Sequence, residues 1–218
     1  MQENSSTLTI RHILISMLFF TAVPFLSKLV NVFVVQESIS LMFSMNICIS
    51  FLVFYNWKLI ELHWQRYISS LEDALLYTVI GAVFLGFWHW IGRGFLQAQV
   101  LLPSADVLIA YGYARPGMLI SFSLMKAFAL NITFKVMTDH MNITGRELET
   151  ILLSGLMFGF LLTVLFTDFN ISLLFRTYLY NMVLSAILSY LYNQTNSILT
   201  GTFALAGVSL ASMILSII

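Results

Sequence analysis

The sequence predicts an all-α fold: a polytopic bundle of seven or eight transmembrane helices in a single domain that covers residues 1–218. Of its residues, 59% are hydrophobic and only 9% are charged, and the mean hydropathy is +0.90. A water-soluble chain of this length could not bury so much apolar surface. A bilayer accommodates that surface when each spanning segment is a helix, because a helix satisfies its own backbone hydrogen bonds.

Seven segments meet the requirement for a membrane span, which is about 20 mainly apolar residues. They cover residues 13–35, 39–59, 74–92, 117–138, 149–167, 171–192 and 197–218. Residues 95–112 are also apolar, but Pro103 and Asp106 interrupt them. This segment forms either an eighth, broken span or an interfacial segment.

The predicted connections between the spans are short and polar. They cover residues 61–73, 138–147, 168–170 and 193–197. All four tryptophans lie near predicted helix ends, as in the aromatic belt at a membrane–water interface. They are Trp57, Trp64, Trp88 and Trp90.

Charge, cysteine and histidine content exclude several classes of function. The formal net charge is zero, so no basic field favours nucleic acid as a partner. The single cysteine, Cys48, excludes a disulfide within the chain. The motif HExxH is absent and the four histidines lie on different segments, so we expect neither a metal site nor a cofactor.

Small residues four positions apart predict close contacts between helices. Gly155 and Gly159 share one helix face, as do Gly207 and Ala211. Such pairs let the backbone of a neighbouring membrane helix approach closely. We therefore expect both pairs to serve helix packing.

Polar residues inside predicted spans indicate internal contacts. Lys126 lies deep within a span, where a charge costs roughly 2.5–3.5 kcal/mol on insertion scales. Arg176 lies nearer to the start of its helix, and Asn131 shares a helix with Lys126. Lys126 either pairs with an acid such as Asp168 or Glu149, lines a pocket that binds a partner, or extends its amine to the interface.

Two C-terminal segments resemble parts of a known family of membrane proteases. Residues 192–201, YNQTNSILTG, are similar to a short turn between two of its core helices, and residues 154–162, SGLMFGFLL, are similar to the helix that carries its second motif. On these segments the chain resembles the CAAX protease and bacteriocin-processing (CPBP) family over about residues 105–215. The resemblance implies a CAAX-protease-like core in the C-terminal half.

The catalytic motifs of that family, EExxxR, FxxxH and HxxxN, are degenerate in this chain. Phe158 occupies the aromatic position of the second motif. The other motif positions carry Met125, Lys126, Leu130, Leu162, Leu205 and Ser209. These residues cannot replace a glutamate that activates water or the His and Asn groups that assist it. The resemblance therefore implies the fold of the family without its catalytic residues.

The resulting hypothesis is a catalytically inactive, CAAX-protease-like protein of the cytoplasmic membrane. The resemblance implies that it binds a membrane protein or peptide, as a scaffold, an accessory subunit or a bacteriocin-immunity protein. The expected site is the former catalytic cavity, lined by Met125, Lys126, Leu162, Leu205 and Ser209.

Two alternatives to this hypothesis remain open. The first is the substrate-binding membrane subunit of a vitamin-type transporter, in which Lys126 or Arg176 would meet an anionic substrate. The second is an active intramembrane protease that uses atypical residues.

Overall fold

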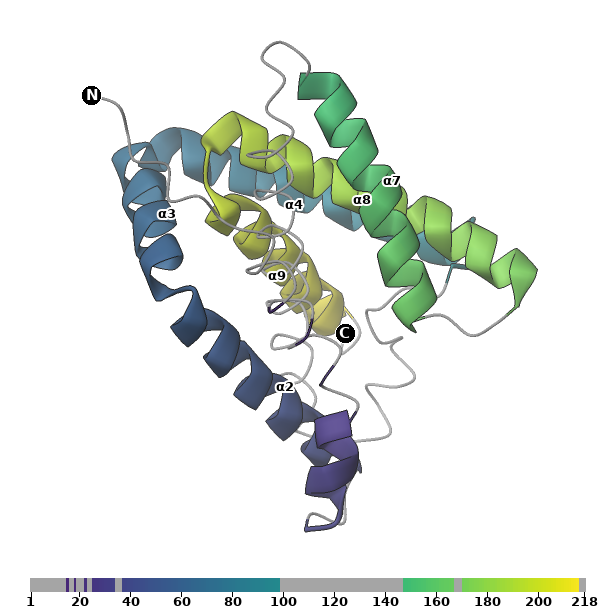
Figure 1. The fold of residues 1–218 in the computed structure, drawn as a ribbon. Coiled ribbons are helices and arrows are strands. Elements are labelled where there is room, and N and C mark those ends of the chain that lie inside the picture. The colour runs from purple at the N-terminus through teal and green to yellow at the C-terminus, as the bar shows by residue number, and fades with distance from the viewer. Residues whose placement is uncertain are drawn as a thin grey trace.

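The computed structural model describes residues 25–33, 37–98, 147–166 and 170–215, together with the single residues Ile15, Leu18 and Ala22. Its described part contains helices and no strand, which confirms the all-α prediction. Residues 25–31 are helical. The longer helices are α2 (Glu37–Tyr55), α3 (Trp57–Ser69), α4 (Leu71–Gly94), α7 (Glu147–Phe166), α8 (Ile171–Thr195) and α9 (Ile198–Leu215) (Figure 1).

Among the described helices, α4 and α8 are long and apolar enough to cross a membrane. They contain 24 and 25 residues, and at 1.5 Å per residue each is longer than the hydrocarbon core of about 30 Å. They run antiparallel, because Tyr77 contacts Gln194 while Trp88, further along α4, contacts Tyr180. The start of α4 and the end of α8 therefore lie at the same end of the bundle (Figure 1).

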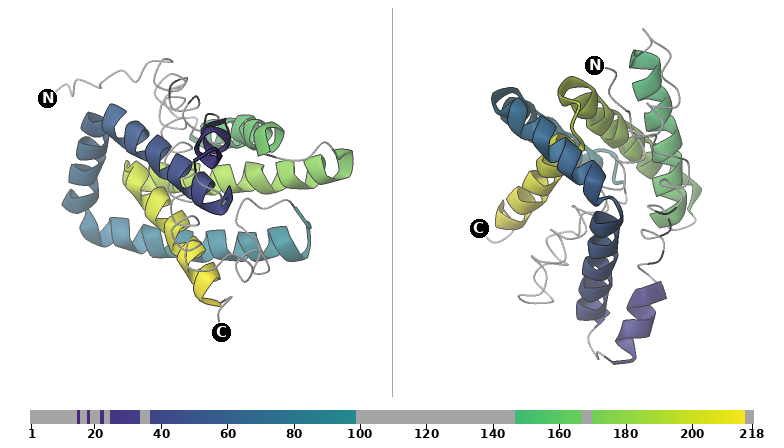
Figure 2. Two further views of the ribbon diagram at one scale, coloured as in Figure 1. Left: turned by 90° about the horizontal axis from the view of Figure 1, so that it is seen from below. Right: turned by 60° about the vertical axis from the view of Figure 1, so that its left-hand side comes forward.

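The segment between α2 and α4 differs from the sequence prediction. The single helix expected at 39–59 ends at Tyr55 and a new helix, α3, begins at Trp57. The side chain of Asn56, at the break, donates to the carbonyl of Leu52 at 2.9 Å. Helix α3 then occupies most of the expected polar connection at 61–73. It crosses the end of α4 at a steep angle, so that α2, α3 and α4 form a U (Figure 2, left).

Helix α3 has a polar composition, but the residues that it buries recur at helical spacing. Its buried residues are four positions apart, at Leu59, His63 and Tyr67. This spacing places them on one face of a helix. The prediction of a connection there was wrong because it weighed average polarity and not periodicity.

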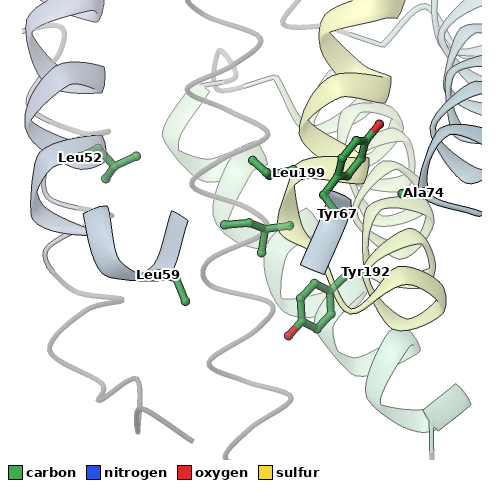
Figure 3. Close-up of a cluster of buried hydrophobic side chains, with 7 residues drawn as sticks. Leu52, Leu59, Tyr67, Ala74, Tyr192 and Leu199 are labelled. Atoms are coloured by element: carbon green, nitrogen blue, oxygen red, sulfur yellow. The ribbon is translucent and has the colours of Figure 1, made fainter. Parts of the chain in front are cut away.

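A cluster of buried apolar side chains joins five helices, and α3 is one of them. Helices α2, α3, α4, α8 and α9 all contribute to it (Figure 3). The members are Leu52, Leu59, Tyr67, Ala74, Tyr192, Ile198 and Leu199. This cluster positions the turn between α8 and α9 against α3.

Helix α7 packs across α8 through glycines (Figure 1). A Cβ added to Gly155 would lie 2.9 Å from the carbonyl oxygen of Met182, and one added to Gly159 would lie 2.8 Å from the Met182 Cα. The backbones therefore approach to a distance that only glycine permits. Gly207 differs, since a Cβ there meets no described atom within 4 Å, and Ala211 is exposed.

Candidate functional site

A cluster of polar residues, most of them buried, lies where α3 meets the turn between α8 and α9. We call it the α3 junction; it comprises His63, Arg66, Thr195, Asn196, Ser197 and Thr200. The turn depends on Asn196, which has φ 50° and ψ 21° in the left-handed region. Asparagine adopts this conformation more readily than most residues, and it commonly ends helices in this way. The last carbonyls of α8 then need partners from elsewhere.

Helix α3 supplies partners for the carbonyl of Asn196, the residue that caps α8. The Nδ1 of His63 lies 3.1 Å from the carbonyl oxygen of Asn196, and Arg66 Nη1 donates to the same oxygen at 3.4 Å. Because a carbonyl can only accept, Nδ1 of His63 carries the proton. In return, the Ser197 hydroxyl donates to the carbonyl of His63 at 3.0 Å. The helix and the turn are thus joined in both directions by residues 133 and 134 positions apart.

Hydroxyl groups complete the turn from within. Thr195 Oγ1 donates to the carbonyl of Leu191 at 2.9 Å and accepts from Thr200 Oγ1 at 2.9 Å. The side-chain oxygen of Ser197, Oγ, accepts a hydrogen bond from the backbone N–H of Leu199 at 3.3 Å. This is the N-cap arrangement that satisfies a free N–H at the start of a helix, here α9.

An open pocket of about 370 Å³ adjoins the α3 junction. Its lining residues are Arg66, Ser69, Ser70, Thr195 and Asn196. The Ser69 and Ser70 hydroxyls donate to the carbonyl of Arg66 at 2.9 and 3.0 Å. Because both hydroxyl protons are used in these bonds, the oxygens of Ser69 and Ser70 remain as acceptors in the pocket, beside the guanidinium of Arg66. It can recognise a polar group that both donates and accepts hydrogen bonds, such as an amide.

Two of the residues predicted to line the former catalytic cavity belong to α9. Leu205 and Ser209 are buried, with 3% and 1% of their surface exposed, and the Ser209 hydroxyl donates to the carbonyl of Leu205 at 3.0 Å. Phe158 and Leu162 belong to α7, and nothing is described of their side chains. Four further predicted site residues lie outside the described residues, namely Met125, Lys126, Leu130 and Asn131.

Arg176 lies near the start of α8, at the end of the bundle opposite the α3 junction. Its guanidinium donates to the carbonyl and the hydroxyl of Ser172, at 3.3 and 2.7 Å, and to Gln97 Oε1 at 3.1 Å. Gln97 has φ 49°, in the left-handed region. Arg176 therefore ties the turn that follows α4 to the start of α8.

A buried aromatic contact between α4 and α8 was missed from sequence. The Trp88 ring stacks on Tyr180 with centroids 6.2 Å apart, and its Nε1 donates to the Tyr180 carbonyl at 3.0 Å. His89 Nδ1 lies 3.4 Å from the Tyr180 hydroxyl. Trp88 lies near the end of α4, as predicted, and the structure adds that its ring packs on a neighbouring helix. Gly92, one turn further along α4, leaves room for the Tyr180 ring.

The sequence did not predict the α3 junction, apart from the turn that contains Asn196 and Ser197. Asn196 and Ser197 fall within the segment 192–201 that resembles a family turn. His63 and Arg66 fall in the expected connection at 61–73. Helical spacing around His63 was the signal that would have placed it on a buried face.

Comparison with known proteins finds no match for this chain. No protein-family model matches it, and neither a curated protein nor a solved structure does. Within the described ranges, no three His, Cys, Asp or Glu residues are grouped so that they could hold a metal ion.

Proposed function

We propose that this chain is a multi-pass protein of the cytoplasmic membrane, with a catalytically inactive CAAX-protease-like core, that binds a membrane protein or peptide partner. The observation that carries the proposal is the pocket beside the α3 junction. It lies at the shared end of the two long apolar helices and offers hydrogen bonds through Arg66, Ser69 and Ser70. Groups of this kind recognise a ligand by hydrogen bonding.

The membrane location is supported by the exposure of the long apolar helices. Only 22% of the apolar window of α4 is buried, and 33% of that of α8. The exposed side chains of α4 include Val79, Val83, Phe84 and Phe87. A water-soluble protein rarely exposes a continuous apolar surface of this kind, whereas lipid or another membrane helix covers it favourably.

The inactive core is supported by the positions in α9 that correspond to the third family motif. Leu205 and Ser209 are buried, and the Ser209 hydroxyl bonds to its own helix. A serine in that arrangement stabilises a helix locally. Neither side chain can act as the general base that the family chemistry requires.

Affinity purification with a matched pair of variants tests the proposal. Ser69→Trp fills the pocket with an indole and leaves Arg66 in place, whereas Gln65→Trp adds the same ring to an exposed position on α3 that does not line the pocket. The tagged full-length chain is purified from membranes in mild detergent, and co-purifying proteins are quantified by mass spectrometry. We expect one membrane protein or peptide to be recovered with the unsubstituted chain and with Gln65→Trp.

Ser69→Trp should reduce the recovery of that partner about tenfold, which corresponds to about 1.4 kcal/mol of binding free energy. Equal recovery with both variants would overturn the role of the pocket. Cleavage of a transmembrane substrate by the purified protein, abolished by a single polar substitution, would instead revive the active protease.

A second candidate function is the substrate-binding membrane subunit of a small-molecule transporter. The pocket volume of about 370 Å³ favours it, since small-molecule sites range from about 300 to 1,000 Å³. In that case the purified protein would carry a low-mass ligand and would co-purify with an ATPase pair. The same purification therefore distinguishes the two functions.

A further inference from the structure

Helix α3 carries an exposed apolar face that is distinct from its buried face. At about 100° per residue, positions 57, 64 and 68 project from one side of a helix. The residues there are Trp57, Trp64 and Ile68, which are 59%, 50% and 48% exposed. We call them the indole face. The core-facing side consists of Leu59, His63 and Tyr67.

A third side of α3 is polar and exposed. It includes Lys58, Gln65 and Ser69, while Glu61 lies at its border with the indole face. Arg66 follows Trp64 by two positions, which is about 200° around the helix. The pocket lined by Arg66 and Ser69 therefore opens on the side of α3 away from the indole face.

The position of α3 in the fold assigns an environment to each side. Helix α4 begins two residues after α3 ends, and the bonds of His63 and Ser197 join α3 to the end of α8. Helix α3 thus crosses the shared end of the two helices that are long enough to span a membrane (Figure 2, left). When those helices cross a bilayer, α3 lies along its surface.

The chemistry of the indole face fits the boundary between headgroups and acyl chains. Tryptophan combines a large apolar ring with one N–H donor, and it concentrates at this depth in membrane proteins. The Trp64 ring stacks on Tyr67 with centroids 6.5 Å apart and planes 14° apart. Because Tyr67 is buried, this contact holds Trp64 against the bundle.

We infer that α3 is an in-plane interfacial helix whose indole face contacts phospholipid, while the pocket beside Arg66 opens to water. This inference rests on the proposed membrane location. It deepens the proposed function, because the partner must then reach the pocket through a segment outside the hydrocarbon core. An amide-bearing peptide segment that follows or precedes a membrane helix fits this geometry.

Tryptophan quenching in the reconstituted full-length chain tests the contact with lipid. Phosphatidylcholine vesicles carry bromines either high or low on the acyl chain. A variant that keeps Trp64 and replaces the other tryptophans by Phe reports on the indole face. Phe84→Trp, made in a chain without other tryptophans, reports on the exposed middle of α4. We expect shallow bromines to quench Trp64 best and deep bromines to quench the α4 probe best.

The pair of probes separates the two proposals. Deep quenching at position 84 without lipid quenching of Trp64 would overturn the interfacial helix and leave the membrane location standing. Loss of quenching at both positions would overturn both proposals. Protection of Trp64 from lipid and from aqueous iodide alike would indicate that a protein surface covers the indole face, which also contradicts the inference.

Cysteine labelling provides a second measurement that leaves every tryptophan in place. Ile68→Cys and Ser69→Cys are adjacent on α3 but lie on the indole face and the polar side, respectively. A membrane-impermeant maleimide added to opened vesicles should label position 69 at least tenfold faster than position 68. Cys48 is buried, so the unsubstituted chain serves as the background. Equal labelling rates would overturn the assignment of the two sides.

Discussion

At the residue scale, one backbone carbonyl connects three helices. The carbonyl oxygen of Asn196 accepts hydrogen bonds from His63 and Arg66 of α3. The left-handed backbone of Asn196 allows α9 to start two residues later. A basic side chain near a helix C-terminus both satisfies a free carbonyl and opposes the helix dipole. The position of this carbonyl therefore depends on the backbone conformation of Asn196.

Substitution of Asn196 tests the importance of that conformation. Asn196→Val should lower the free energy of unfolding by about 1–3 kcal/mol, because a β-branched residue is strained at positive φ. Asn196→Gly should cost little, because glycine adopts this region freely. Thermal unfolding in mild detergent, followed by circular dichroism, compares the two variants. Equal melting temperatures of the two variants would contradict the prediction that position 196 requires a residue tolerant of positive φ.

Two buried serines of α8 offer a matched test of hydrogen bonding inside the bundle. Ser189 Oγ lies 3.0 Å from Ser154 Oγ of α7, whereas Ser185 Oγ has no partner among the residues that the structure describes. Ser189→Ala should destabilise the protein by about 0.6 kcal/mol, the average for such bonds in membranes. Ser185→Ala should be neutral or stabilising, because an unpaired buried hydroxyl costs about 1–3 kcal/mol. Denaturant unfolding in detergent measures the free energy of unfolding of both variants. A greater loss with Ser185→Ala than with Ser189→Ala would contradict this assignment.

At the element scale, helix boundaries could be predicted where turn chemistry is local. The end of α8 and the start of α9 lie within the segment 192–201, because Asn and Ser are residues that favour turns and caps. Helix α3 was not predicted, because the average polarity of the segment was weighed above the helical spacing of Leu59, His63 and Tyr67. His63 is a polar residue that is completely buried, and average polarity alone would place it in a connection.

The contact between α7 and α8 depends on the absence of a side chain. Gly159→Ala would place a Cβ 2.8 Å from the backbone of Met182, so the helices must separate. We expect a loss of about 1–3 kcal/mol in the free energy of unfolding. Gly207→Ala is the control; it meets no described atom within 4 Å and should be neutral or stabilise by up to about 1 kcal/mol. Unfolding in mild detergent compares them, and equal stability would contradict close packing of α7 on α8.

At the scale of the whole molecule, the antiparallel pair α4 and α8 defines two ends with different chemistry. One end holds the α3 junction and its pocket, and the other holds Arg176 with Gln97. The contacts Tyr77–Gln194 and Trp88–Tyr180 fix the alignment of the two helices between these ends. A bilayer crossed by this pair separates the pocket from Arg176.

Labelling from one side of the membrane tests that arrangement. Glu72→Cys lies in the first turn of α4 and Arg93→Cys in its last, and both positions are exposed. In sealed vesicles of uniform orientation, an impermeant maleimide should label only one of them. Opening the vesicles should make the other reactive. Labelling of both positions in sealed vesicles would contradict a membrane-spanning α4.

The sequence by itself determined the helical class and the long apolar helices, because composition and apolar run length are properties of each segment alone. It also indicated the turn at Asn196 and Ser197, since that turn depends on local residue chemistry. Only the tertiary structure revealed the α3 junction, the Trp88–Tyr180 contact and the pocket. Each of these joins residues far apart in the chain, and their pairing depends on how the helices cross. The function proposed here depends on that pairing, because the pocket exists only where α3 meets the end of α8.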